Sequence, residues 1–186
     1  MDFPTRKRNR LAEYDYSHAG SYFVTICTSP RKNVFWQVEE HARLQLALPL
    51  NPVVGADIIR PVSDIIRPED VPLSSVGKIV ETGILSISQH YDDVEVEHYC
   101  IMPDHIHLLI LFHGDIFGKT VCPPLSTVIG SLKRWVSKQL GYSIWQKSFY
   151  EHIIRSERDY NKILMYIEHN PLQWQIDHGN DSAWDC

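Results

Sequence analysis

The sequence predicts an α/β (α+β) fold of the ferredoxin-like sandwich type, with an antiparallel central sheet, helices on one face and an added C-terminal helix. The main observation is the order of its patterns. Segments typical of strands and segments with helical spacing of apolar residues follow one another as β(β)-α-β-β-α-β-α. The second observation is length, since 186 residues suit one domain with a core of its own. We therefore treat 1–186 as a single domain with a flexible insertion at about 45–75.

The first strand is expected at 21–29, where "SYFVTICTS" is rich in β-branched and aromatic residues. A polar turn, "PRKN", follows it. The next segment, "VFWQV" at 34–38, has the composition of a short strand and could pair with the first strand as a hairpin.

The segment 45–75 contains DIIRP twice, at 57–61 and 64–68. Two short copies are too few for a solenoid. Five prolines between 49 and 72 oppose regular helix or sheet. The pattern favours a surface insertion with a duplicated loop, and a binding motif is the alternative.

The middle of the chain predicts one helix and two strands. Apolar residues recur at helical spacing over 74–91, and alternation then indicates a strand over 93–102. Pro103 and Asp104 interrupt the chain before a second strand at 105–112.

The C-terminal third predicts a helix, an extended segment and a last helix. The helix covers 125–141 with Gly141 as its C-cap, and 143–155 is expected to be extended. Ser156 and Asp159 form an S-x-x-D start for the last helix, which is expected to run to about Asn170. Pro171 should end it, because the residue before a proline avoids the α region.

Composition is that of a soluble globular protein, with 44% hydrophobic and 22% charged residues and a net charge of −5. No apolar run approaches a membrane span, and the N-terminus lacks a hydrophobic signal core. We therefore expect a cytoplasmic protein with no membrane partner. The four scattered cysteines contain no CxxC pair, which predicts reduced thiols and no zinc ribbon.

Two histidines interrupt the apolar stretch "MPDHIHLLI" at 102–110. Side chains alternate along a strand, so His105 and His107 should point to the same face, about 6.5–7 Å apart. Two imidazoles at the open end of a strand suit one metal ion. A pair of hydrogen-bonded histidines at a strand end is the alternative, and a third ligand is needed to decide between them.

The last helix offers that ligand. Tyr166 and Asn170 are four residues apart, so they share a helical face. The amide oxygen of Asn170 is a ligand for hard cations. Taken alone, Tyr166 is an interfacial core residue, but beside a two-histidine site it becomes a candidate nucleophile.

The joint pattern resembles a known family. "MPDHIHLLI", followed by "SFYEHIIRSERDYNKILMYIEHNPLQW", is similar to the single-tyrosine HUH transposases, and more narrowly to the REP-associated tyrosine transposases. The resemblance implies a divalent metal, Mg²⁺ or Mn²⁺, held by His105, His107 and Asn170. It also implies that Tyr166 attacks single-stranded DNA, which leaves a 5′-phosphotyrosine link and a free 3′-hydroxyl. Hairpin DNA and a homodimer are implied as partners, and a monomer stays open.

With DNA as the substrate, the basic residues become candidate backbone contacts. They are Arg6, Lys7, Arg8 and Arg10 near the N-terminus, Lys133, Arg134 and Lys138 on the 125–141 helix, and Arg155. Binding of this kind would associate the protein with the nucleoid. The acidic net charge argues against strong sequence-independent affinity.

Two alternatives stay open. One is a domesticated, catalytically inactive protein that binds hairpin DNA. The other is a relaxase or replication-initiator-like nickase. Relaxases usually place the tyrosine near the N-terminus and take a third histidine from the same motif. Because the tyrosine here follows the HxH pair, the order favours the transposase.

Overall fold

The computed structural model describes residues 19–37, 73–114 and 122–178. In chain order the elements are β1 (Gly20–Cys27), α2 (Ser75–Leu85), α3 (Ile87–His90), β2 (Val94–Ile101), β3 (His105–Phe112), α4 (Leu125–Leu140), β4 (Tyr150–Ile154) and α5 (Glu157–His178). None of the helices formed by these residues is long and apolar enough to span a bilayer.

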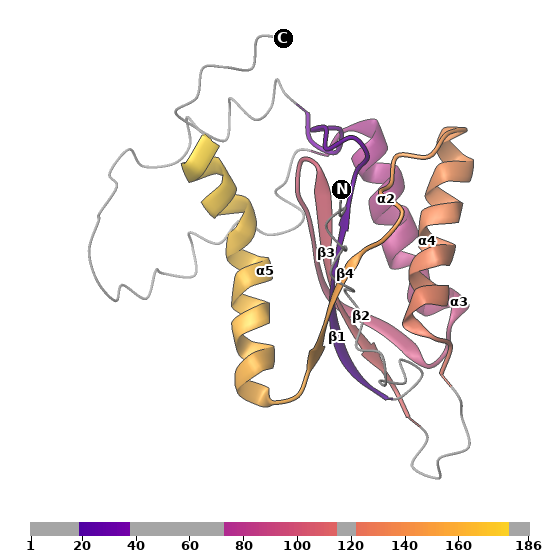
Figure 1. Cartoon of the computed structure of the whole chain (residues 1–186), viewed down its shortest axis with the longest axis vertical. Helices are drawn as coiled ribbons and strands as arrows, with labels where there is room; N and C mark the ends of the chain where they lie inside the picture. Colours follow the sequence, from indigo (N-terminus) through magenta and orange to yellow (C-terminus); the bar gives the residue numbers. More distant parts are fainter. Residues whose placement is uncertain (1–18, 38–72, 115–121, 179–186) are drawn as a thin grey trace, which may run out of the picture.

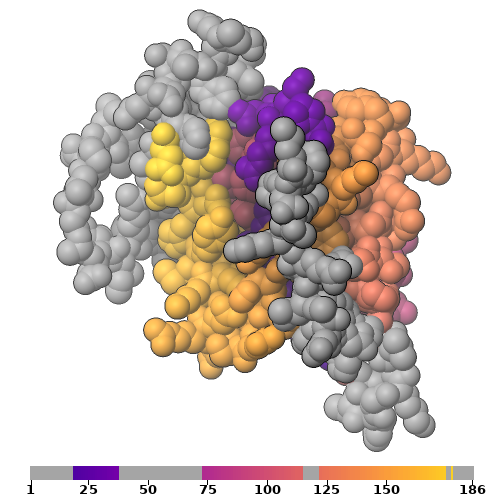
Figure 2. Space-filling model, in the orientation of Figure 1, coloured from indigo at the N-terminus to yellow at the C-terminus, as the bar shows by residue number. Residues whose placement is uncertain are grey.

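The four strands form one antiparallel sheet in the order β2-β3-β1-β4, so β3 and β1 are central. This is the order of a ferredoxin-like sandwich, and the predicted fold class is confirmed. Figure 1 shows α2 and α4 side by side on one face of the sheet and α5 alone on the other. The space-filling view shows α5 (yellow) and α4 (orange) on opposite flanks of the molecule (Figure 2).

Alternation along the two central strands divides the sheet into two faces. The face under α2 and α4 is mainly apolar, although the buried Glu151 on β4 is in register with Val24. Its central side chains have no exposed surface: Tyr22, Val24, Ile26, Ile106, Leu108 and Ile110. The other face carries Phe23, Thr25, His105 and His107, and α5 covers it. One face therefore forms the main core, and the other is available for chemistry.

Close packing of α2 on α4 depends on Gly83. A Cβ at this position would lie 2.9 Å from Leu132 and 3.0 Å from Trp135, so a larger residue would force the helices apart. The predicted 74–91 helix is divided at Ser86, whose hydroxyl donates to the carbonyl oxygen of Gly83 at 2.8 Å. Serine side chains compete in this way with the helical backbone.

The predicted caps of the two longer C-terminal helices are confirmed. Gly141 follows α4 in the left-handed conformation, with φ of 79°. Ser156 precedes α5, and its hydroxyl accepts a hydrogen bond from the backbone N–H of Asp159 at 3.2 Å.

The predicted strand at 34–38 and its hairpin with β1 are wrong over the described residues 34–37. Both edges of β1 are occupied, by β3 and by β4, so no position is left for a hairpin partner. Instead the N–H groups of Val34 and Phe35 donate to the Pro103 carbonyl, and Trp36 forms an isolated bridge with Leu73. The extended segment predicted at 143–155 is a strand only over Tyr150–Ile154.

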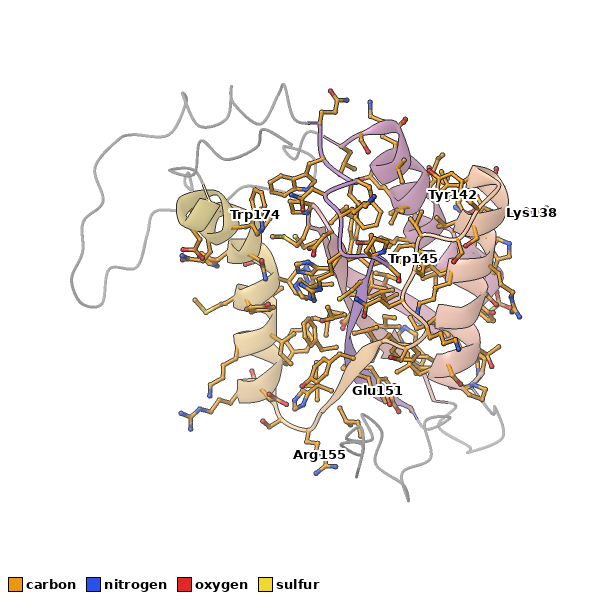
Figure 3. All side chains as sticks on the ribbon, turned by 45° about the horizontal axis from the view of Figure 1, so that its top comes forward. Lys138, Tyr142, Trp145, Glu151, Arg155 and Trp174 are labelled. Atoms are coloured by element: carbon orange, nitrogen blue, oxygen red, sulfur yellow. The ribbon has the colours of Figure 1, made fainter. Side chains whose placement is uncertain are left out.

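The prediction that Pro171 ends the last helix is also wrong, because α5 continues to His178 with Pro171 inside it. A proline inside a helix removes one backbone hydrogen bond. Tertiary packing offsets this loss. Leu172 is only 4% exposed, and the ring of Trp174 lies 5.2 Å from that of Trp36 (Figure 3).

Most of the predicted insertion at 45–75, with its DIIRP repeat, lies outside the described residues. Three of the four cysteines lie within them. Cys27, Cys100 and Cys122 are free thiols, as expected.

Candidate functional site

The two histidines lie side by side on the face covered by α5. His105 and His107 occupy alternate positions at the start of β3, and their Nε2 atoms are 3.0 Å apart. His107 is only 3% exposed, whereas His105 lies nearer the surface. The strand therefore brings two ring nitrogens to one point, as its alternation predicts.

Helix α5 brings Tyr166 and Asn170 to the same point. The Tyr166 hydroxyl is 3.5 Å from His107 Nε2, and the Asn170 side-chain nitrogen is 3.3 Å from the same atom. A 180° rotation of the amide exchanges its nitrogen and oxygen, so its oxygen can face the imidazoles equally well. All four residues singled out in the sequence thus meet at one nitrogen atom.

An aromatic ring forms the floor of this site. Phe23 stacks on His107 with ring centroids 5.3 Å apart, and it meets Tyr166 edge-on at 5.9 Å. Tyr166 is nevertheless 50% exposed. Its ring is therefore fixed by packing while its hydroxyl stays within reach of a large substrate.

The outer ring nitrogens have partners that orient both imidazoles. His107 Nδ1 lies 2.9 Å from the Thr25 hydroxyl, and His105 Nδ1 lies 2.5 Å from the Asp104 carboxylate. The other carboxylate oxygen of Asp104 faces Arg31 at 3.4 Å. Histidines that bind metals usually have such partners on the nitrogen turned away from the metal.

Burial and charge fix the ionisation of this group. Burial, reinforced by the neighbouring charge of His105, lowers the pKa of His107 to about 3, so its ring is neutral at pH 7. Burial alone would raise the pKa of Asp104. The hydrogen bond and charge of His105, together with the charge of Arg31, outweigh burial and lower that pKa, so Asp104 is a carboxylate.

The donor set is chemically suited to a divalent metal ion. The ring nitrogens suit manganese and other transition ions, and the amide oxygen suits hard cations such as Mg²⁺ and Mn²⁺. Two ligands at right angles, each about 2.1 Å from an octahedral ion, lie about 3.0 Å apart. The Nε2 atoms have this separation. Among the described residues no three His, Cys, Asp or Glu side chains form a metal group, so Asn170 is the available third ligand.

Among the described residues, the structure does not bring the predicted DNA contacts to this site. Lys133, Arg134 and Lys138 lie on α4, across the sheet from α5, and Figure 3 shows Lys138 on that far side. The Lys133 ammonium donates to the carbonyl oxygens of Gln146 and Ser148 at 2.9 and 3.0 Å, which indicates a structural role. Arg155 is exposed at the turn between β4 and α5. The N-terminal group Arg6, Lys7, Arg8 and Arg10 lies outside the described residues.

Sequence reasoning missed three residues of the site. Thr25 could have been found only from the register of β1 on β3, which places it opposite His107. Arg31 lies in the loop after β1, and the composition of a loop does not predict which residues its side chains contact. Asp104 offered a local signal, since it directly precedes the HxH pair.

Comparison with known proteins first defines the class of fold. The chain is similar to the structure of a REP-associated tyrosine transposase bound to a REP hairpin, with a TM-score of 0.55, 18% identity, and coverage of 89% of this chain and 73% of that one. At this identity the likeness establishes a shared fold. No family model matches the sequence.

Sequence relatives come from Haemophilus influenzae. One, named "Uncharacterized protein", is 27% identical over 92% of this chain and 91% of its own length. Another, named "Putative REP-associated tyrosine transposase", is 31% identical over 100 residues, which is 46% of this chain and about half of that protein, 53%. The resemblance to REP-associated tyrosine transposases is thus confirmed, in sequence over part of the chain and in fold over most of it.

Proposed function

We propose that the protein is a metal-dependent endonuclease and strand transferase for single-stranded DNA, of the tyrosine transposase type. The observation that carries the proposal is the convergence of His105, Asn170 and Tyr166 on the Nε2 atom of His107. A structural pair of histidines would not require an exposed tyrosine and an amide at the same nitrogen. The shared fold with a hairpin-bound transposase supports DNA as the substrate.

In this proposal the Tyr166 oxygen attacks a backbone phosphorus atom. The new bond joins the tyrosine to the 5′-phosphate, and the bond to the 3′-oxygen breaks. The Tyr166 hydroxyl loses one proton and the leaving oxygen gains one, so that it departs as a 3′-hydroxyl. Reversal with another 3′-hydroxyl rejoins strands. Tyr166 is 50% exposed and its ring is held by Phe23 and His107, so the residue is both accessible and oriented.

His105, His107 and Asn170 would hold the divalent ion, which supplies Lewis-acid stabilisation of the charge that develops on the phosphate. These ligands carry no negative charge. The carboxylate that contacts His105, that of Asp104, is balanced by Arg31. The phosphate would therefore be the main anion at the site, which favours its binding.

The partner DNA would be a hairpin with a single-stranded flank, and the protein would act as a homodimer or a monomer. Exposed Arg155 and the N-terminal basic group would contact the backbone. The α4 residues would do so only if the DNA extends across to the far face of the sheet.

A covalent-adduct assay tests the proposal. End-labelled hairpin oligonucleotides with single-stranded flanks, taken from DNA that borders the gene, are incubated with protein and Mn²⁺ and run on a denaturing gel. We expect an adduct that Tyr166→Phe abolishes. Tyr142→Phe is the matched control, because Tyr142 is similarly exposed but lies beyond α4, on the far side of the sheet (Figure 3).

Two results would count against the proposal. An adduct that survives Tyr166→Phe would exclude this nucleophile. Hairpin binding without cleavage in either Mg²⁺ or Mn²⁺ would favour the inactive, DNA-binding alternative.

A further inference from the structure

The carboxylate beside the HxH pair is placed to control one imidazole. Asp104 accepts from His105 Nδ1 at 2.5 Å, and both side chains are only 15% exposed. An ionised carboxylate has no hydrogen to donate. The ring nitrogen that faces it must therefore carry the hydrogen, which leaves a lone pair on Nε2 at the other side of the ring.

The backbone around Asp104 is fixed by bonds from three separate positions. Its carbonyl oxygen accepts from the N–H and the hydroxyl of Thr28, at 2.9 and 3.0 Å. The preceding carbonyl, of Pro103, accepts from Val34 and Phe35. A side chain on such a restrained turn has little freedom to move away from His105.

The far side of the carboxylate is fixed as well. Arg31 lies 3.4 Å from Asp104 Oδ2, and its second nitrogen donates to Cys27 Sγ at 3.0 Å. The three side chains therefore form a chain of contacts, Arg31–Asp104–His105, that ends at the Nε2 atom facing His107.

We infer that Asp104, supported by Arg31, is a positioning residue that holds His105 in the tautomer with hydrogen on Nδ1 and the Nε2 lone pair directed at a divalent metal ion. This inference deepens the proposed function and rests on its metal site. The partner of the distal nitrogen sets which nitrogen of a histidine binds a metal. Loss of such a partner typically weakens metal affinity about 10- to 100-fold.

Thr25 complements this arrangement at His107. A hydroxyl can donate or accept, so Thr25 does not select one tautomer by itself. It can accept the Nδ1 hydrogen of His107 whenever Nε2 is engaged by a metal. Asp104 therefore selects the tautomer of His105, and Thr25 can form a hydrogen bond with either tautomer of His107.

The test has two parts. The first measures the tautomer of His105 in the metal-free protein, and the second measures the affinity of the protein for Mn²⁺. Long-range ¹H–¹⁵N NMR of the metal-free full chain, at a pH where both rings are neutral, reports which nitrogen of His105 carries hydrogen. We expect Nδ1 in the native protein and a mixture of both tautomers in Asp104→Ala. Titration with Mn²⁺ alone, followed by electron paramagnetic resonance, should show about 10- to 100-fold weaker binding in the variant.

Asp92→Ala is the matched control, because Asp92 is an exposed carboxylate two residues before β2. This variant should change neither the tautomer of His105 nor the affinity for Mn²⁺. Asp104→Asn keeps an acceptor of the same shape and should restore Mn²⁺ affinity in part. Melting temperatures of all variants show whether the fold is kept.

The inference is overturned if Asp104→Ala keeps the native tautomer of His105, or if a folded Asp104→Ala binds Mn²⁺ as the native protein does. It is also overturned if the native protein binds no Mn²⁺. A protein that passes these measurements yet never forms a DNA adduct would instead refute the proposed function.

Discussion

Docking of α5 on the sheet can be tested through Ile167, which is 2% exposed and adjacent to Tyr166. Ile167→Ala removes three carbon groups, worth about 0.8 kcal/mol each in transfer free energy, or about 2.4 kcal/mol together. The cavity left behind adds to this cost. We expect a total loss of about 3 kcal/mol, inside the range of about 2–5 kcal/mol for such changes.

The assay is urea unfolding followed by circular dichroism, with hydrogen exchange to localise the effect. The control is Met165→Ala, two positions earlier on α5, where the side chain is 59% exposed. It should change the free energy of unfolding by no more than about 0.5 kcal/mol. Amide protection should fall more in α5 than in β3, since α5 packs on the sheet as a separate layer. Equal stabilities for the two variants would refute the docking of α5 described above.

Two further predictions concern the fold away from the site. Gly83→Ala should destabilise the protein by about 1–3 kcal/mol because its Cβ would meet Leu132 and Trp135, whereas Gly130→Ala, with open space around it, should stabilise α4 by up to about 1 kcal/mol. Thermal unfolding of both variants tests this prediction. A Gly83→Ala variant as stable as the native protein would contradict the close contact between α2 and α4. Asp159→Asn should lower stability at pH 6, because the hydrogen bond from His152 lowers the pKa of Asp159 and so favours the folded state. That contribution is present above about pH 4, the usual carboxyl pKa, and is lost as the pH falls through the lowered value. Urea titrations from pH 6 to pH 3 should show the difference shrinking, and a constant difference would argue against the contribution of this hydrogen bond.

The parts of the fold that sequence could predict are those with strong local patterns. The alternation of β3 gave its bounds and the shared face of His105 and His107, and Gly141 marked the end of α4. The spacing of Tyr166 and Asn170 placed both on one face of a helix. These features depend on neighbouring residues alone.

The parts that failed depend on distant residues. The segment 34–37 resembles a strand in composition, but both edges of β1 are already occupied. Pro171 does not end α5, because burial of Leu172 and the contact of Trp174 with Trp36 offset the lost backbone hydrogen bond. The basic residues on α4 could not be assigned to a face before the sheet topology was known.

The position of α5 on the free face of the sheet has a consequence for biosynthesis. The sheet and its two covering helices are complete at Ile154, and both imidazoles are by then in the chain. Tyr166 and Asn170 come later, on α5, which follows every other element of the described residues. A chain that is truncated or stalled before α5 therefore carries two of the three proposed metal ligands and no nucleophile. On the proposed function such a fragment could not cut DNA, so activity would arise only after α5 has been synthesised and has packed on the sheet.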